Sequence, residues 1–329
     1  MESVESSYSR TMEEVQESLK LAVIKESDLQ KVTQILYSTE EPNVEEHIKL
    51  LELDDHLLET VNKGDRPKLE KLLNVLEPTS FKGIEYESSI SHELLYDWHR
   101  LKNEIQASEA ELIQALKDYL ITNIDGYFRL ISFEFEARSL TLMLDLFEEN
   151  SWEIDEIDKE ITYEFLKELI YKPVFNILFT KYTEISEKSK KDGTPLYRYN
   201  EEKCCKTLAK VLFVASPVTE YKHFMKSWNI GTPEKIEPKE EYLYGIALVR
   251  WNNLMEKEIV SFSETDLPID VDERFNKLFK AKKKWTVQEI TPYIINLTTN
   301  KMNVNALLTK YARSSIVNGI KYYSSKYDK

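Results

Sequence analysis

Hydrophobic residues near the carboxy-terminal end of the chain recur with the spacing of short helices. Between Arg274 and Lys280, apolar side chains fall on one side of a helix, and they are Phe275, Leu278 and Phe279. Further along, apolar residues at i, i+3, i+4 and i+7 predict a second buried stripe. Its members are Val304, Leu307, Leu308 and Tyr311, and the opposite row is Ala306, Thr309, Lys310 and Arg313. The pattern predicts two helices, each with one apolar face.

A third helix is predicted between these two. Thr286 is a good N-cap residue and Glu289 follows three positions later, which forms a capping box. Pro292 is expected to kink or restart this helix, since proline has no backbone N–H to donate. After the last helix, Asn318-Gly319 is a turn pair that tolerates positive φ, and the alternation that follows is typical of a hairpin strand. Three helices and a hairpin together predict a winged helix.

The same order of helices and a wing is predicted twice upstream. In the first, a capping box at Ser108 and Glu111 is followed by a turn at Asp125-Gly126 and a strand-like run. Residues 159–188 alternate acidic and apolar positions, which predicts a long amphipathic helix, and residues 188–195 are interpreted as a linker. In the second, two helices precede the apolar strand 245–249, which can pair with 259–262.

The amino-terminal part of the chain gives mixed signals. Residues 1–15 are polar and acidic, and they are expected to form a leader. Residues 19–24 and 47–53 alternate enough for two strands, and two strands are not stable alone. The predicted domains are 1–87 (leader, two strands and linker), 88–192 (first winged-helix-like domain plus the long helix), 193–270 (second winged helix) and 271–329 (third, basic winged helix).

Composition supports a mainly α-helical fold with small β-hairpins. The chain has 329 residues, 42% of them hydrophobic, which is enough for two or three folded domains. Seven glycines are few for this length, so a glycine-rich phosphate-binding loop is not expected. The helices and hairpins predicted above therefore indicate a mainly α-helical fold of tandem winged helices.

Charge is distributed unevenly along the chain. The net charge of −14 argues against a general nucleic-acid binder, because an acidic surface repels phosphate. Residues 276–329, however, hold eleven Lys and Arg against two acids, a balance of +9, which leaves −23 for the rest. This arrangement favours a protein that docks its basic end on DNA and its acidic body on protein partners. A solvated basic tail is the alternative.

The candidate DNA-binding residues all lie in the basic end. The residues expected to contact the DNA backbone are Lys301, Lys310, Arg313 and Lys321. The run Lys282, Lys283 and Lys284 fits a localisation signal, a phosphate clamp or a solvated turn. Base-specific contact is not expected, because the helix that carries Ala306 at the centre of its exposed row offers few bidentate donors. Trp285 is expected to anchor the core.

Several classes of chemistry have no counterpart in the sequence. There is no P-loop, HExxH, GxSxG or dinucleotide fingerprint, and we expect no catalytic site, cofactor or metal. The only cysteines, Cys204 and Cys205, are adjacent, so they build neither a disulfide framework nor a zinc site. No run of eighteen apolar residues occurs, and an intracellular protein that does not span a membrane is expected.

The residue types at fixed offsets in the last third of the chain resemble a known family. They are Asp266-Leu267-Pro268, Glu273-Arg274-Phe275, Trp285, Pro292, Lys310-Tyr311 and Asn318-Gly319. With matches over roughly 88–150 and 196–326, the chain resembles the sister-chromatid-cohesion subunit of the alternative replication factor C clamp loader. That family often closes on Ser-Arg, whereas this chain has Ser325-Lys326, which keeps the charge without the bidentate fork.

The resemblance implies a non-catalytic accessory subunit in the nucleus. Its expected partners are the other clamp-loader subunits, the leading-strand DNA polymerase, the sliding clamp indirectly, and DNA without sequence preference. In the family an amino-terminal β-barrel is shared between subunits, and several strands precede an Arg-Pro-Lys-Leu segment. Here residues 63–65 run straight into Arg66-Pro67-Lys68-Leu69, so a block of strands is expected to be missing. The resemblance therefore implies that residues 1–87 hold a leader, a truncated β-barrel-type region and a linker before the tandem winged helices. The rival hypotheses are a protein-interaction scaffold and a sequence-specific transcription regulator.

Overall fold

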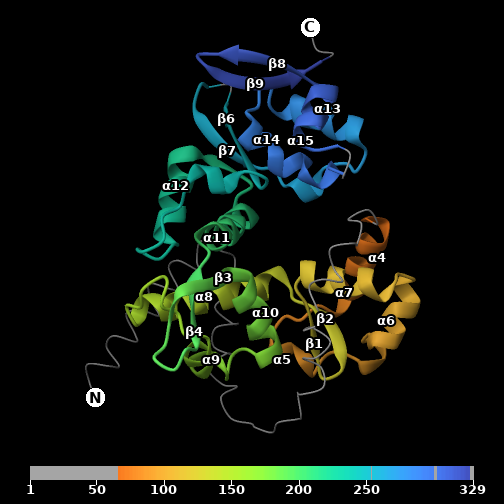
Figure 1. Cartoon of the computed structure of the whole chain (residues 1–329), viewed down its shortest axis with the longest axis vertical. Helices are drawn as coiled ribbons and strands as arrows, with labels where there is room; N and C mark the ends of the chain where they lie inside the picture. Colours follow the sequence, from red (N-terminus) through yellow and green to blue (C-terminus); the bar gives the residue numbers. More distant parts are fainter. Residues whose placement is uncertain (1–65, 253, 300–301, 327–329) are drawn as a thin grey trace. The chain divides into compact units, whose positions relative to one another are not determined.

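The described part of the chain folds into two compact units. The computed structural model describes residues 66–252, 254–299 and 302–326 (Figure 1). Contacts divide these residues into a first unit, 66–200, and a second unit, 201–326. The predicted leader and amino-terminal strands lie outside the described residues. Within the described residues the sheets are small and antiparallel, and none closes into a barrel.

The first unit alternates short helices with two hairpins. Its elements are α4 (Arg66–Leu76), α5 (Ile84–Glu87), α6 (Trp98–Ile105), α7 (Glu109–Asp118), β1 (Ile121–Ile124), β2 (Tyr127–Leu130), α8 (Phe133–Glu149), α9 (Lys159–Leu166), α10 (Lys172–Tyr182), β3 (Thr183–Ser189) and β4 (Pro195–Tyr199), with 3₁₀ turns at Glu77–Thr79 and His92–Leu94. The predicted capping box at Ser108 and Glu111 is present and begins α7. Asp125 and Gly126 both have positive φ in the turn that joins β1 to β2.

Three helices and a hairpin share one core at the start of this unit. It contains Leu72 and Leu76 of α4, Leu101 and Ile105 of α6, Leu112 and Leu116 of α7, and Ile121 of β1. The helical order therefore begins at Arg66, which is upstream of the predicted start at residue 88. Arg129 of β2 is 1% exposed and is held by Glu87 through two contacts of 2.6 and 2.9 Å.

The predicted long helix over 159–188 is wrong. Two short helices, α9 and α10, are followed by the strand β3. Pro173 lies in the first turn of α10, where a missing N–H costs nothing, and the chain before it cannot continue as helix. The predicted linker at 188–195 is the end and turn of a hairpin: Lys190 N–H donates to Thr194 at 2.8 Å, and Gly193 has a φ of 87°.

The second unit contains two small sheets and five α-helices among its described residues. The elements are α11 (Glu201–Ala215), β5 (Val218–Glu220), α12 (Tyr221–Ile230), β6 (Ala247–Trp251), β7 (Lys257–Ser261), α13 (Val271–Ala281), α14 (Val287–Ile294), α15 (Val304–Tyr311), β8 (Ala312–Val317) and β9 (Ile320–Ser325), with 3₁₀ turns at Glu240–Leu243, Glu264–Asp266 and Ile295–Leu297. The predicted pairing of 245–249 with 259–262 is confirmed, and β5 adds a third strand in the order β5-β7-β6.

The carboxy-terminal helices and hairpin form around one hydrophobic core. Its buried members are Leu248, Leu267, Phe275, Leu278, Phe279, Trp285, Ile290, Tyr293, Ile294, Leu307, Leu308, Ala312 and Tyr323. The predicted stripes on α13 and α15 face this core. Leu248 belongs to β6, and the Tyr293 hydroxyl donates to the carbonyl of Ala247 at 3.0 Å. Residues on both sides of position 270, the predicted boundary between the second and third winged helices, therefore share one core.

Local signals at the ends of these elements are confirmed. Thr286 and Glu289 form the predicted capping box of α14. This helix passes through Pro292 and ends at Ile294, so it does not restart at the proline. Asn318 and Gly319, with φ of 51° and 80°, make the two-residue turn of the β8–β9 hairpin.

Candidate nucleic-acid interface

The lysine-rich loop after α13 is hydrogen-bonded to the hairpin. Trp285 N–H donates to the carbonyl of Tyr323 at 2.9 Å, and Tyr323 N–H donates back to the carbonyl of Trp285 at 2.8 Å. The two residues thus form an antiparallel bridge on the open edge of β9. This bridge joins the segment of lysines that precedes Trp285 to the β8–β9 hairpin.

The indole of Trp285 fixes the end of α13. Its Nε1–H donates to the carbonyl of Lys282 at 2.7 Å and to that of Leu278 at 3.3 Å, so it satisfies acceptors that the helix end leaves open. The side chain is fully buried and meets Tyr293 edge to face at 5.4 Å. The expectation that Trp285 anchors the core is confirmed.

The three lysines of the loop are not equivalent. Lys282 makes an ion pair with Glu289 at 2.7 Å, and its Nζ lies 5.6 Å from the Trp285 ring. That contact ties it to the capping box of α14 and neutralises its charge locally. Lys283 and Lys284 are exposed, so they carry the free positive charge of this segment.

Helix α15 presents one row of exposed residues. It begins at Asn303, whose side chain accepts from the N–H of Ala306 at 2.9 Å. Ala306, Thr309 and Lys310 are exposed, as predicted. A hydrogen bond with Tyr311 raises the pKa of Lys310, which keeps this ammonium charged.

The carboxy-terminal end of α15 is capped by a lysine of the following segment. Lys326 Nζ donates to the carbonyl of Thr309 at 3.1 Å and to that of Lys310 at 2.5 Å. A cation at this end complements the helix dipole. Lys326 therefore lies close to Lys310, and its ammonium serves the fold as well as the local positive charge.

Arg313 does not lie on the helix row in which it was expected. The helix ends at Tyr311, and Arg313 is the second residue of β8, opposite Ser324. Lys321 lies opposite Ile316. Because side chains alternate between the faces of a strand, Arg313 and Lys321 project from opposite faces of the hairpin. Both are exposed.

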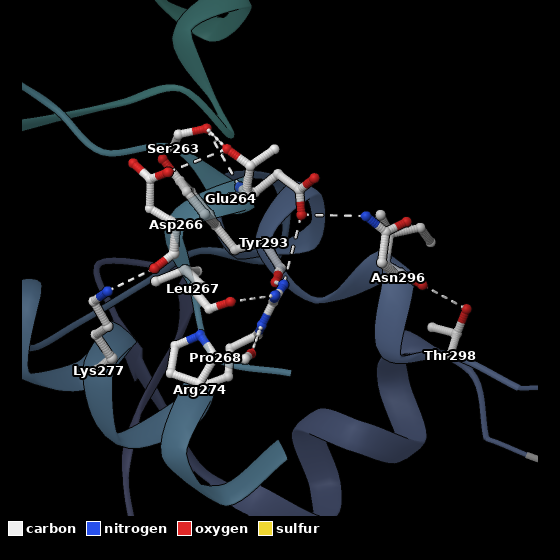
Figure 2. A network of polar contacts seen from close by, with 12 residues as sticks. Ser263, Glu264, Asp266, Leu267, Pro268, Arg274, Lys277, Tyr293, Asn296 and Thr298 are labelled. Atoms are coloured by element: carbon white, nitrogen blue, oxygen red, sulfur yellow. Dashed lines mark hydrogen bonds and ion pairs between the residues drawn. The ribbon is translucent and has the colours of Figure 1, made fainter. Parts of the chain in front are cut away.

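Arg274, just before the basic end, has a structural role. Arg274 is fully buried and donates to the carbonyls of Pro268 at 2.6 Å, Tyr293 at 2.8 Å and Leu267 at 3.0 Å (Figure 2). Glu264 lies 3.6 Å from the guanidinium. The guanidinium thus joins the motif Asp266-Leu267-Pro268 to α13, which carries the motif Glu273-Arg274-Phe275, and to α14.

The structure brings some predicted site residues together and leaves others apart. Lys283 and Lys284 are linked to the hairpin through the bridge at Trp285, while Lys301 lies outside the described residues. Sequence reasoning missed the exposed aliphatic tip of the hairpin, Ile316, Val317 and Ile320. The signal was available: two consecutive apolar residues before a two-residue turn cannot both face one core.

Elsewhere in the described residues, the two cysteine thiols are poor nucleophiles. Cys204 and Cys205 are both buried, and desolvation raises the pKa of each thiol, to about 12 for Cys205. No helix within the described ranges has the length and apolar character to cross a bilayer.

Comparison with known proteins decides the family. The model of the family "Sister chromatid cohesion protein Dcc1" matches residues 6–294, which is most of the chain. The chain belongs to this family. Among curated members, the sister chromatid cohesion protein DCC1 of Xenopus laevis is 34% identical over 262 residues, 79% of this chain and 66% of that protein. The human protein of the same name is 30% identical over 262 residues, with the same coverage of both chains.

The match to the Dcc1 family does not extend over the whole of its members. The chain covers slightly less than two thirds of the length of the first relatives, 66% for Xenopus laevis and 65% for the mouse protein. The family model ends at residue 294, before α15 and the β8–β9 hairpin. The structure thus describes the basic β8–β9 hairpin, which the family match does not cover.

Proposed function

We propose that this chain is a non-catalytic accessory subunit of the alternative clamp loader and acts in DNA replication and sister chromatid cohesion in the nucleus. Its relatives are named as cohesion proteins, and membership of the Dcc1 family supports the same role here. The chain tethers the complex, and subunits with a nucleotide-binding motif open the clamp. Its partners are those subunits, the leading-strand polymerase, DNA and, indirectly, the sliding clamp.

The tether at the carboxy-terminal end is a winged helix that binds the DNA backbone. One observation carries this proposal: between Glu289 and Asp328 the sequence has five basic residues and no acid, and exposed members of that set lie on α15 and the hairpin. The helices α13, α14 and α15 followed by β8–β9 have the order of a winged helix. We extend the same description to α4, α6, α7 and β1–β2, and to α11, α12 and the sheet β5-β7-β6.

Binding is sequence-neutral in this account. The exposed row of α15 contains Ala306, Thr309 and Lys310. The Thr309 hydroxyl donates to the carbonyl of Asn305 at 2.8 Å, so its hydrogen is already used within the helix. Lysine contacts phosphate as a point charge, and Asn305 is the single exposed side chain of α15 with the geometry to read a base edge through two hydrogen bonds. A randomised-duplex selection is therefore expected to return no base preference.

The acidic remainder of the chain docks on proteins. The sequence outside residues 276–329 carries a net charge of −23. In this proposal its amino-terminal region meets the barrel partners, and the middle segments meet the polymerase. The division into four domains, with boundaries at 87, 192 and 270, is part of the same proposal.

Charge reversal separates this function from that of a protein-only scaffold. In the triple variant Lys310→Glu, Arg313→Glu, Lys321→Glu, DNA affinity should fall by at least about a hundredfold, since three phosphate contacts become repulsions. Co-purification with the clamp-loader subunits should persist. The matched control changes Lys191, Lys222 and Lys226, which are exposed elsewhere, to Glu. Equal losses in both triple variants, or loss of assembly with DNA binding intact, would favour the scaffold.

A further inference from the structure

The tip of the β8–β9 hairpin exposes aliphatic side chains around its turn. Ile316 is 75% exposed, Ile320 50% and Val317 39%. The tight turn at Asn318-Gly319 gathers them at one end of the hairpin. Inner residues of the same strands, Ala312 and Tyr323, are only 5% exposed, so the hairpin is anchored at its base and free at its tip. An apolar tip held out by an anchored base marks a contact surface.

Charge around this tip favours a polyanion as its partner. The charged residues of β8 and β9 are Arg313 and Lys321, and both are basic. The β6–β7 turn provides a contrast within the same unit. There Leu254 and Met255 are 78% and 77% exposed, but Arg250 and Lys257 of the two strands are matched by Glu256 and Glu258. The charges of the β6–β7 hairpin therefore cancel, whereas both charges of the β8–β9 hairpin are positive and complement phosphate.

The two cations of the hairpin are placed to meet two strands. They project from opposite faces, as the register shows, with Lys321 opposite the tip residue Ile316. Arg313 lies four residues before Val317, or about 13 Å along the strand, so it is set back from the tip. A hairpin with a cation on each face and apolar side chains at its end fits between two diverging polynucleotide strands.

We propose that this tip is an apolar wedge for a junction between single-stranded and duplex DNA. Ile316, Val317 and Ile320 pack on the open face of the last base pair, while Lys321 and Arg313 each hold the backbone of one diverging strand. The inference rests on the proposed DNA binding, because it specifies which DNA structure the same interface takes.

A junction is preferred over continuous duplex for a physical reason. Inside a duplex each base pair is stacked on both sides, so a wedge must first unstack a base step. At a junction the last base pair is already open on one side, and contact with it removes apolar surface from water without that cost. The same aliphatic side chains therefore add affinity at a junction and none on closed duplex.

The test compares two DNA molecules with the full chain. One is a closed dumbbell duplex without ends, and the other a forked junction, in which two single strands diverge from a duplex, with the same number of phosphates and a 2-aminopurine in the last base pair. The wild-type chain should bind the junction about tenfold more tightly than the dumbbell and change the 2-aminopurine fluorescence. Equal affinity for the two, with no fluorescence change, would overturn the inference and leave the proposed DNA binding intact.

Variants of the tip make the test specific. Ile316→Ser with Ile320→Ser should abolish the preference and the fluorescence change, with dumbbell affinity within about twofold, because the cations are kept. Leu254→Ser with Met255→Ser is the matched control and should behave as wild type. A tip variant that keeps the junction preference but loses a protein partner would contradict the wedge. Failure of the wild-type chain to bind either DNA would refute the proposed function itself.

Discussion

Trp285 and Tyr323 exchange two main-chain hydrogen bonds across 38 residues of sequence, with lengths of 2.9 and 2.8 Å. Tyr323 belongs to β9, and Trp285 follows the exposed Lys283 and Lys284. This bridge therefore joins two basic segments, the loop after α13 and the β8–β9 hairpin. The buried indole of Trp285 supports the bridge from the core.

Removal of that indole should strongly destabilise the second unit. Trp285→Ala creates a large cavity and leaves the carbonyl of Lys282 without its donor, so we expect a loss of about 3–5 kcal/mol in the free energy of unfolding. Urea denaturation followed by circular dichroism measures it. Lys284→Ala, one residue away and exposed, is the control and should change the stability by less than about 0.5 kcal/mol. Similar stabilities for the two variants would show that Trp285 does not anchor the core.

Arg274 should act on stability and leave DNA contact to other residues. Arg274→Ala leaves the carbonyls of Leu267, Pro268 and Tyr293 without their donor, at a cost of about 3–5 kcal/mol. Lys277→Ala removes a single exposed contact and is the control. Chemical denaturation and DNA binding are measured on the same samples. A normally stable Arg274→Ala variant that had lost DNA affinity would identify this guanidinium as a phosphate ligand instead.

Asp145 should make the first unit less stable as the pH rises. Burial, together with Glu149 and Glu148, raises the pKa of this carboxyl to about 7 in the folded chain. The folded state therefore holds its proton more tightly than the unfolded state, and stability falls between about pH 4 and pH 7. The side chain is half-buried, so we expect about 1–3 kcal/mol, below the full value of such a shift.

Asp145→Asn tests this dependence. The variant should match the wild type near pH 4 and be more stable above pH 7, as seen in urea denaturation at both pH values. Glu93→Gln, at an exposed position of the same unit, is the control. If Asp145→Asn and the wild type keep the same stability difference at both pH values, the carboxyl is not protonated in the folded chain.

Local patterns in the sequence predicted much of this fold because their causes are local. The capping box at Thr286, the turn at Asn318-Gly319 and the stripe containing Leu307 and Leu308 each depend on residues within a few positions of one another. Family resemblance supplied the assignment, and the comparisons confirm it.

Features that depend on distant residues were not predictable in this way. Arg313 was assigned to a helix face, but the chain changes from helix to strand at Ala312, and the period of its side chains changes with it. The pairing of Lys282 with Glu289 and the contacts of Lys326 with α15 require knowledge of which ends meet in space. The candidate site was predicted from charge alone, and charge does not show which lysines are paired within the fold.

The salt dependence of DNA affinity tests the central claim most directly. With about four basic residues on phosphate, the logarithm of the affinity of the full chain should fall with the logarithm of salt concentration at a slope of roughly −3 to −4. Fluorescence anisotropy with a short duplex, between low and physiological salt, measures this slope. A slope near zero, or one unchanged by the Lys310, Arg313 and Lys321 charge reversals, would contradict the account.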